Sequence, residues 1–174
     1  MNEFSWQTWQ AKEKAVLVFL KIEERILLIR KKRGLGQGKI NAPGGRLEAG
    51  ESFAQAGIRE TWEETKLQVS QLEEVATLSF AFTDGYGLFV KAFFAYAYEG
   101  TPQETDEALP FWHPWASMPW DEMWADDPHW LKPVLDGHYA TGKFLFENDT
   151  MLTKELEIFR RPPFSLQTLV DNRK

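Results

Sequence analysis

Apolar residues occur along the chain in short runs that are typical of buried strands. Residues 15–20 and 26–29 are continuous apolar stretches, and they predict two strands joined by a charged turn. Residues 75–83 and 88–98 predict a hairpin pair, because a glycine-containing turn separates them. Residues 143–147 favour a late strand. We therefore expect a sheet.

Helix signals lie between and after these strands. Ser52 and Gln55 have the spacing of a capping box, and helical periodicity continues after them. Residues 120–124 predict a short helix. Asp127, which precedes a proline, predicts the start of another helix that Gly137 would end. The mixture predicts an α+β fold, a sheet with about two or three helices.

The organisation of the chain favours one domain. No repeat, low-complexity tract or glycine-serine linker divides the 174 residues, so we expect a single domain over residues 1–174. The last stretch, residues 156–174, contains Arg160-Arg-Pro-Pro163 and is interpreted as a helix end followed by a loose tail. The sequence leaves the oligomeric state open, and we favour a monomer.

Composition excludes several classes of protein. The chain has no cysteine, so a disulfide-stapled scaffold is excluded and a cytoplasmic location is expected. No apolar run approaches the roughly 20 residues of a membrane span, and the amino terminus does not resemble a signal peptide. A net charge of -6 argues against stable binding to DNA or membranes, although not against one nucleotide.

The candidate chemistry is concentrated in a run of glutamates. Glu60, Glu63 and Glu64 are spaced i, i+3 and i+4, so a helix would carry all three carboxylates on one face. Like charges at these spacings repel, and a bound Mg²⁺ ion would make the cluster favourable. The alternative is an ordinary acidic, solvated helix face. The outlying residues argue for the ion: Glu51 precedes the helix cap, where the chain could fold back and pair it with Arg59.

With these residues in place, the segment resembles the Nudix signature, Gly-x5-Glu-x7-Arg-Glu-U-x-Glu-Glu-x-Gly-U, where U is a bulky aliphatic residue. Two positions depart from the pattern. Thr61 replaces an aliphatic residue, and its methyl group can still pack. Lys66 replaces the glycine that normally ends the helix in a left-handed conformation, so we expect a different helix exit or some strain. The matching positions are Gly45, Glu51, Arg59, Glu60, Glu63, Glu64 and Leu67.

The resemblance implies a Nudix fold, a mixed sheet between helices, that hydrolyses nucleoside diphosphates linked to another moiety. It implies Mg²⁺ as the cofactor, with Mn²⁺ able to substitute, and Glu51 with Arg59 as a supporting ion pair. Water would attack a phosphorus, with a carboxylate positioning or deprotonating it. Which glutamate is the base, which phosphorus is attacked and how many metals bind stay open. The implied metal-binding positions are the Gly45 carbonyl, Glu60, Glu63 and Glu64.

Outside the signature, residues 31–41, 100–107, 123–130 and 142–146 are similar to the oxidised-purine nucleoside triphosphatases, and the likeness covers about residues 14–155. Those enzymes remove nucleotides such as 8-oxo-dGTP and 2-hydroxy-dATP. By this likeness Asn41, Asp126 and Asp127 would hydrogen-bond the purine, Trp124 would stack on it, Lys31 would meet phosphate and Glu107 would lie near the metal. The pocket lining would be Phe80, Phe82, Leu88 and Phe146. Leu35, Ile40 and Pro43 depart from the aromatic residues expected there.

Each of these residues also has a purely structural interpretation. Asp127 could cap a helix, Trp124 could be core packing, and Asn41 could be a turn residue. Lys31 and Glu107 could be solvated surface charges. At the level of function, two alternatives to the oxidised-purine hypothesis stay open: a Nudix hydrolase of an ordinary NTP, a nucleotide sugar or an RNA 5′-triphosphate end, and a catalytically silent nucleotide-binding module. A P-loop enzyme is excluded, because the glycines at 34, 36 and 38 lack the required spacing.

Overall fold

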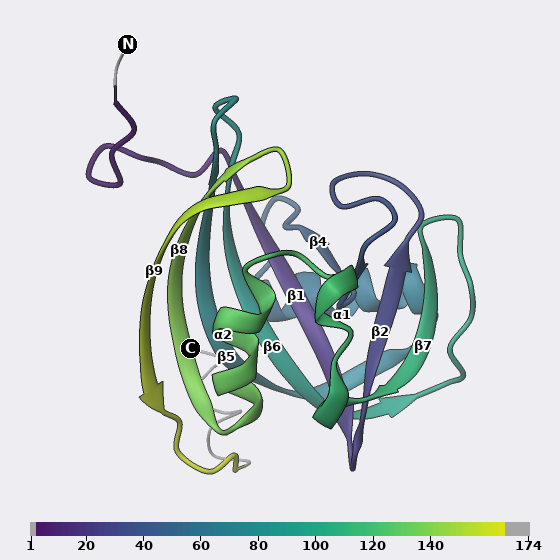
Figure 1. Ribbon diagram of the computed structural model, residues 1–174. Coiled ribbons are helices and arrows are strands. Elements are labelled where there is room, and N and C mark those ends of the chain that lie inside the picture. The colour runs from purple at the N-terminus through teal and green to yellow at the C-terminus, as the bar shows by residue number, and fades with distance from the viewer. Residues whose placement is uncertain (1–2, 166–174) are drawn as a thin grey trace.

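The computed structural model describes residues 3–165, and its strands form one mixed sheet (Figure 1). The main strand order is β3-β2-β1-β6-β5-β8-β9, with β4 pairing with β1 and β7 with β2. The strands are β1 (Glu13–Ile22), β2 (Arg25–Lys31), β3 (Ile40–Asn41), β4 (Gly44–Arg46), β5 (Gln68–Phe82), β6 (Gly87–Glu99), β7 (Ala108–Pro114), β8 (His138–Glu147) and β9 (Thr150–Arg160). The helices are α1 (Phe53–Thr65) and α2 (Asp127–Leu135), with 3₁₀ turns at Trp115–Ser117 and Trp120–Glu122.

The sheet is mixed because two of its strand pairs run parallel. β1 is parallel to β6 and β5 is parallel to β8, whereas the other paired strands are antiparallel. β5 and β6 form the hairpin predicted from the sequence, with strands longer than expected. The predicted α+β class and the mixed sheet between helices are confirmed.

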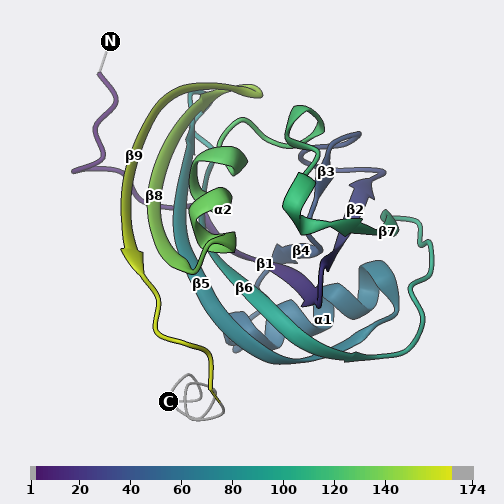
Figure 2. The same cartoon turned by 60° about the horizontal axis from the view of Figure 1, so that its bottom comes forward.

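Two hydrophobic cores lie on opposite faces of the sheet, one under each helix. Figure 2 shows α1 and α2 on these two faces. Side chains of β1 alternate between the cores: Phe19 packs on the α2 side, and Val18 and Leu20 pack on the α1 side. Because both faces are covered, residues 15–20 form an unbroken apolar run rather than an alternating one.

The start of α1 follows the sequence prediction, and its end follows one of the two alternatives expected. Ser52 and Gln55 form the complete capping box. At the other end Lys66 keeps the left-handed conformation, with φ 63° and ψ 23°, and its N–H donates to the Trp62 carbonyl. Of the two alternatives expected for Lys66, a different helix exit is therefore excluded. Lys66 ends the helix in the left-handed conformation that glycine normally adopts at this position. Backbone strain is therefore the consequence of having lysine here.

Other predicted elements need correction. Residues 150–160 are strand β9, antiparallel to β8, so the expected helix end at residue 156 is wrong; residues 166–174 of the predicted tail lie outside the described part of the chain. The predicted helix at 120–124 is a 3₁₀ turn over Trp120–Glu122. The second helix ends as expected just before Gly137, but the residue at its cap position is Asp126, which makes no side-chain capping bond. Asp127 is its first residue.

Helices long and apolar enough to cross a membrane are not found among residues 3–165.

Candidate active site

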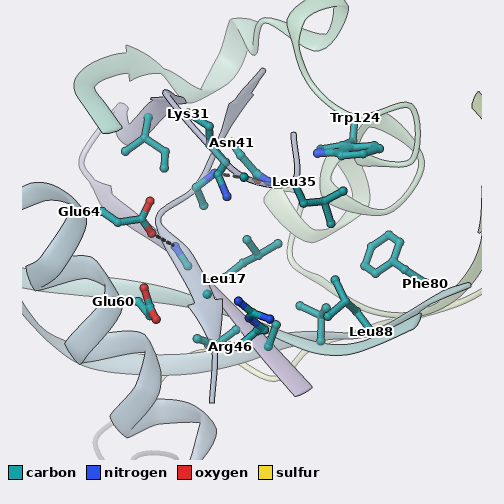
Figure 3. Close-up of a pocket in the computed structure, with 18 of the residues that line it drawn as sticks. Leu17, Lys31, Leu35, Asn41, Arg46, Glu60, Glu64, Phe80, Leu88 and Trp124 are labelled. Atoms are coloured by element: carbon teal, nitrogen blue, oxygen red, sulfur yellow. Dashed lines mark hydrogen bonds between the residues drawn. The ribbon is translucent and has the colours of Figure 1, made fainter. Parts of the chain in front are cut away.

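A cavity of about 730 Å³ gathers the predicted residues from distant parts of the chain. Its wall is built from β1, β4, α1, the β5–β6 hairpin, β8 and the segment before α2 (Figure 3). All five metal-binding candidates line it, namely Gly45, Glu60, Glu63, Glu64 and Glu107. So do all nine substrate-binding candidates: Lys31, Asn41, Phe80, Phe82, Leu88, Trp124, Asp126, Asp127 and Phe146. The remaining two predicted residues are Glu51 and Arg59. Arg59 pairs with Glu51 and hydrogen-bonds Glu60 and the Arg46 carbonyl, which belong to the cavity wall.

Two glycines let the β4 backbone approach the carboxylates of α1. The Gly44 N–H donates to Glu64 Oε1 at 2.8 Å. A Cβ atom at Gly45 would lie 2.4 Å from the Glu60 carboxyl carbon, so a larger residue there would displace that carboxylate. A Cβ atom at Gly44 would lie 2.1 Å from the backbone carbonyl oxygen of Val16, so the pairing of β4 with β1 requires glycine at that position.

Arg59 joins the helix to the loop before it, as the sequence predicted. Its Nε and Nη2 each donate at 2.8 Å to an oxygen of Glu51, which makes a bidentate ion pair. Arg59 also donates to Glu60 at 2.8 Å and to the Arg46 carbonyl at 3.0 Å. The Arg59 hydrogen bonds lower the pKa of Glu51 to about 2, with a further contribution from the Glu48 N–H.

The buried carboxylates carry an electrostatic cost. Burial raises the pKa of Glu64 to about 8, against the opposing effects of the Gly44 N–H and the Lys31 charge. Burial also raises the pKa of Glu60, and the nearby charges of Glu63 and Glu107 add to this shift. A cation placed among these groups would favour their ionised forms.

The donor set matches the chemistry of a divalent metal ion. Four carboxylates on one wall of a cavity are the hard oxygen ligands that Mg²⁺-type ions take. Within the described chain, however, no three acidic or histidine side chains converge on a preassembled ion site. Glu60 is held by Arg59, Glu64 by the Gly44 N–H, and Glu107 by Arg33 at 2.8 Å. Each of these bonds is made by Oε1, so an ion could bind the Oε2 atoms without displacing these partners.

The opposite end of the cavity is aromatic. Phe80 and Phe82 come from β5, Phe146 from β8 and Leu88 from β6. The Phe146 ring centroid lies 6.3 Å from that of Phe80, 5.8 Å from that of Phe82 and 5.5 Å from that of Trp124. Strand pairing of β8 with β5 brings these rings together. They form a flat-sided apolar pocket of the kind that accepts a base.

Two buried aspartates stand at this aromatic end. Asp126 accepts a hydrogen bond from Trp130 Nε1 at 2.9 Å, and Asp127 accepts one from the Trp124 N–H at 3.1 Å. Both residues are 3% exposed, and burial raises the pKa of each carboxyl group, with the Asp126 charge adding to the effect on Asp127. A protonated carboxyl group beside an ionised one offers a donor and an acceptor together. Asn41 of β3 lines the same cavity, and its Oδ1 accepts from the Ala42 N–H at 2.8 Å.

Several cavity residues were not predicted from the sequence. Leu17 and Arg46 appear in Figure 3 between the carboxylates and the aromatic pocket. Arg46 is held by Glu13 at 2.9 Å, and Glu13 also accepts from the Tyr86 hydroxyl at 2.5 Å. The position of Leu17 in an apolar run and that of Arg46 after the glycine pair were available signals. Tyr86 lies in the β5–β6 turn, where no local signal predicted a cavity residue.

The chain is similar to a known protein family over most of its length. The model of the NUDIX domain matches residues 11–134. The chain belongs to the Nudix family. It is therefore a Nudix hydrolase, and enzymes of this family generally need a divalent metal ion. The family match includes β4 and α1, which carry the glycine pair and the glutamates.

Two curated relatives share most of the chain. An oxidized purine nucleoside triphosphate hydrolase of Danio rerio is 38% identical over 131 residues, which are 75% of this chain and 84% of that protein. One of Mus musculus is 36% identical over 142 residues, 80% of this chain and 91% of that protein. The crystal structure of a MutT protein from Bacillus halodurans aligns with a TM-score of 0.75 and 27% identity, covering 83% of this chain and 97% of that one.

Proposed function

We propose that this Nudix hydrolase converts purine nucleoside triphosphates with oxidised bases, such as 8-oxo-dGTP or 2-hydroxy-dATP, to the monophosphate and pyrophosphate. One observation carries the proposal: a single cavity has glutamates at one end and, at the other, an aromatic pocket with two buried aspartates. A polyphosphate and a base could occupy these ends at the same time. The names of the two relatives support the same substrate class.

The base end would recognise the purine through its edge and its face. Asn41, Asp126 and Asp127 would hydrogen-bond the edge, with one aspartate protonated so that it donates. The indole of Trp124 would stack on the ring. Base–aromatic stacking is worth about 1–3 kcal/mol per base in single-strand binding proteins, enough to contribute substantially to affinity. The rest of the pocket would be lined by Phe80, Phe82, Leu88 and Phe146.

The acidic end would hold Mg²⁺, with Mn²⁺ able to substitute, through the Gly45 carbonyl and the carboxylates of Glu60, Glu63, Glu64 and Glu107. When bound, the ion neutralises phosphate charge and lowers the pKa of a coordinated water. The ion pair of Arg59 with Glu51 keeps the helix in register with β4. Lys31 would contact phosphate.

In the reaction, one of the α1 carboxylates accepts a proton from water as the water oxygen bonds to phosphorus. The phosphoric anhydride bond breaks, and pyrophosphate leaves with the bonding electron pair. The protein supplies position and charge, which is most of what phosphoryl transfer requires. We place this reaction in the cytoplasm, where a free nucleotide substrate would be met, and we propose that a monomer performs it.

A Mg²⁺-dependent pyrophosphate-release screen over normal and oxidised nucleotides tests the substrate. We expect kcat/KM for 8-oxo-dGTP or 2-hydroxy-dATP to exceed that for dGTP and dATP by at least about tenfold, equivalent to the loss of one good hydrogen bond. Equal values for all four would refute the oxidised-purine assignment. Inclusion of a nucleotide sugar and a 5′-triphosphorylated RNA shows whether another Nudix reaction takes its place.

Two variants test the acidic end separately from the substrate. Glu63→Gln and Glu64→Gln should each lower kcat, by about 10²-fold or more where the residue serves as the base. Glu155→Gln, on β9 and away from the cavity, is the matched control and should keep full activity. Unchanged turnover in both cavity variants would contradict catalysis by these carboxylates. Size-exclusion chromatography with light scattering tests the monomer.

A further inference from the structure

A lysine that does not line the cavity places its ammonium group over Trp124, the tryptophan at the aromatic end of the cavity. Lys39 Nζ lies 5.1 Å from the centroid of the Trp124 ring. Trp124 lines the cavity, whereas Lys39 is not among the described residues that do so. The ammonium group therefore contacts the indole without lining the cavity. A cation over an indole face is attracted by the ring quadrupole, so this contact holds the ring.

Lys39 is fixed in this position by its surroundings. Its side chain is 26% exposed, and its ammonium lies 3.4 Å from Asp149 Oδ2 in the turn between β8 and β9. The Lys39 N–H donates to the Gly36 carbonyl at 2.9 Å, and the Lys39 carbonyl accepts from the Lys31 N–H at 3.0 Å. The backbone of Lys39 is thus hydrogen-bonded to β2, and its side chain is paired with the β8–β9 turn.

Gly36 in the same loop also packs on this indole. A Cβ atom at Gly36 would lie 2.9 Å from Trp124 Nε1, and the backbone φ of Gly36 is 81°. Both observations exclude a larger residue here without rearrangement. In the glycine-rich loop, residues 34–39, the backbone of Gly36 and the ammonium group of Lys39 therefore pack against Trp124.

The backbone of Trp124 is bonded to Asp127, one of the two buried aspartates of the cavity. The Trp124 N–H donates to Asp127 Oδ2 at 3.1 Å, and the Asp127 N–H donates to the Trp124 carbonyl at 3.1 Å. The positive charge of Lys39 lowers the pKa of Asp127, against the larger effect of burial. The Trp124 backbone and the Asp127 carboxyl group are consequently held together, and the Lys39 ammonium acts on both the indole and this carboxyl group.

We propose that Lys39 is a positioning residue for substrate specificity, which holds Trp124 from outside the cavity in the orientation that stacks on a purine. This inference rests on the proposed function, since it assigns the stacking role to Trp124. It assigns no chemistry to Lys39, which does not line the cavity. Lys39 should therefore affect the affinity for the nucleotide and not the turnover rate.

The first experiment compares variants of two lysines in the same loop region. Lys39→Met should raise KM for the preferred purine triphosphate about five- to tenfold and leave kcat within about twofold, because a cation–π contact at a partly desolvated site is lost. Lys39→Arg, which keeps the cation, should restore most of the affinity. Lys32→Met is the control, since Lys32 pairs with Glu104 and the Thr105 carbonyl and not with Trp124. Unchanged KM in Lys39→Met, or an equal change in Lys32→Met, would overturn the proposal.

The second experiment asks whether Lys39 acts through the indole. Calorimetric titration with the nucleoside monophosphate product measures binding without turnover. The Lys39→Met effect on Kd should disappear in a Trp124→Leu background, because the cation then has no ring to hold. An undiminished effect would mean that Lys39 acts by another route. Activity of the parent protein on purine triphosphates is measured first: its absence refutes the proposed function, whereas its presence with an unaffected Lys39→Met refutes only this inference.

Discussion

The residue that ends α1 occupies a backbone conformation that is costly for an L-amino acid. Lys66 has φ 63°, and its ammonium lies 5.4 Å from the exposed Trp62 ring. Lys66→Gly relieves the strain, although it gives the unfolded chain more freedom and removes the ring contact. We expect a net gain of about 0.5–1 kcal/mol in the free energy of unfolding, measured in urea. Lys66→Ala loses the same contact without relieving the strain, so it should not stabilise; equal effects of both variants would contradict the argument.

The two buried aspartates predict a pH dependence of stability. Burial raises the folded-state pKa of Asp126 and Asp127 above the unfolded value of 3.8. The folded protein then binds more protons than the unfolded chain, so this pair destabilises the fold progressively as pH rises from about 4 through the raised pKa values.

Asp127→Asn should therefore stabilise the metal-free protein, by an amount that is near zero at pH 4 and grows toward neutral pH. The asparagine Oδ1 can still accept from the Trp124 N–H. Urea unfolding at a series of pH values measures the difference. Asp121→Asn removes the same charge from an exposed position and should change the free energy of unfolding little. A gain that is the same at every pH would argue against the titration of this pair.

At the scale of elements, local signals predicted the parts whose structure is decided locally. The capping box located α1, and apolar runs located β1, β2 and the β5–β6 hairpin. β9 was missed because its side chains are mostly exposed, and its pairing with β8 is what makes it a strand. β7 was missed because prolines flank its apolar centre, which an edge position tolerates. Both β7 and β9 are strands because they pair with other strands, and local sequence signals do not predict such pairing.

The last described turn of the chain is fastened to the fold by a buried ion pair. Arg161 Nε donates to Glu73 Oε1 at 3.1 Å, and Arg161 also donates to the carbonyls of Val134 and His138. Tyr96 donates to the same Glu73 oxygen at 2.7 Å. The Glu73 side chain is 3% exposed. The substitution Arg161→Met would leave the Glu73 carboxylate buried, with the Tyr96 hydroxyl as its neutral hydrogen-bond donor.

We expect Arg161→Met to lower the free energy of unfolding by about 3 kcal/mol, measured by urea denaturation. The double variant Glu73→Gln/Arg161→Met should recover part of this loss, since the glutamine oxygen can accept from Tyr96 without a charge. Additive effects of the two substitutions would show that the ion pair is not coupled and would contradict the prediction.

At the scale of the whole molecule, the acidic motif could be predicted as a unit because it lies within one helix and the loop before it. The fold-back of Arg59 onto Glu51 was predicted and is present. The aromatic end was implied only by family resemblance, because its rings come from β5, β8 and the segment before α2. Tyr86 lies in the β5–β6 turn and is held at the cavity by its hydrogen bond to Glu13 of β1, a long-range contact that no local pattern encodes.

The same arrangement predicts how the molecule responds to metal ions. A chain with a net charge of -6 gathers Glu60, Glu63, Glu64 and Glu107 on one cavity wall. An ion that binds only the folded state stabilises it by about 2.7 kcal/mol at one hundred times its Kd. Mg²⁺ or Mn²⁺ should therefore raise Tm, against a sodium chloride control of equal ionic strength.

This rise in Tm should be strongly reduced in Glu60→Gln and Glu64→Gln and retained in Glu155→Gln, whose side chain is exposed on β9. Because burial raises the pKa of Glu64, a neutral glutamine there should also raise Tm without metal, so the metal-induced difference is the quantity to compare. Equal rises in all three variants would show that the ions only screen the acidic surface. A rise confined to proteins with both Glu60 and Glu64 would place the ion at the wall formed by α1 and β4.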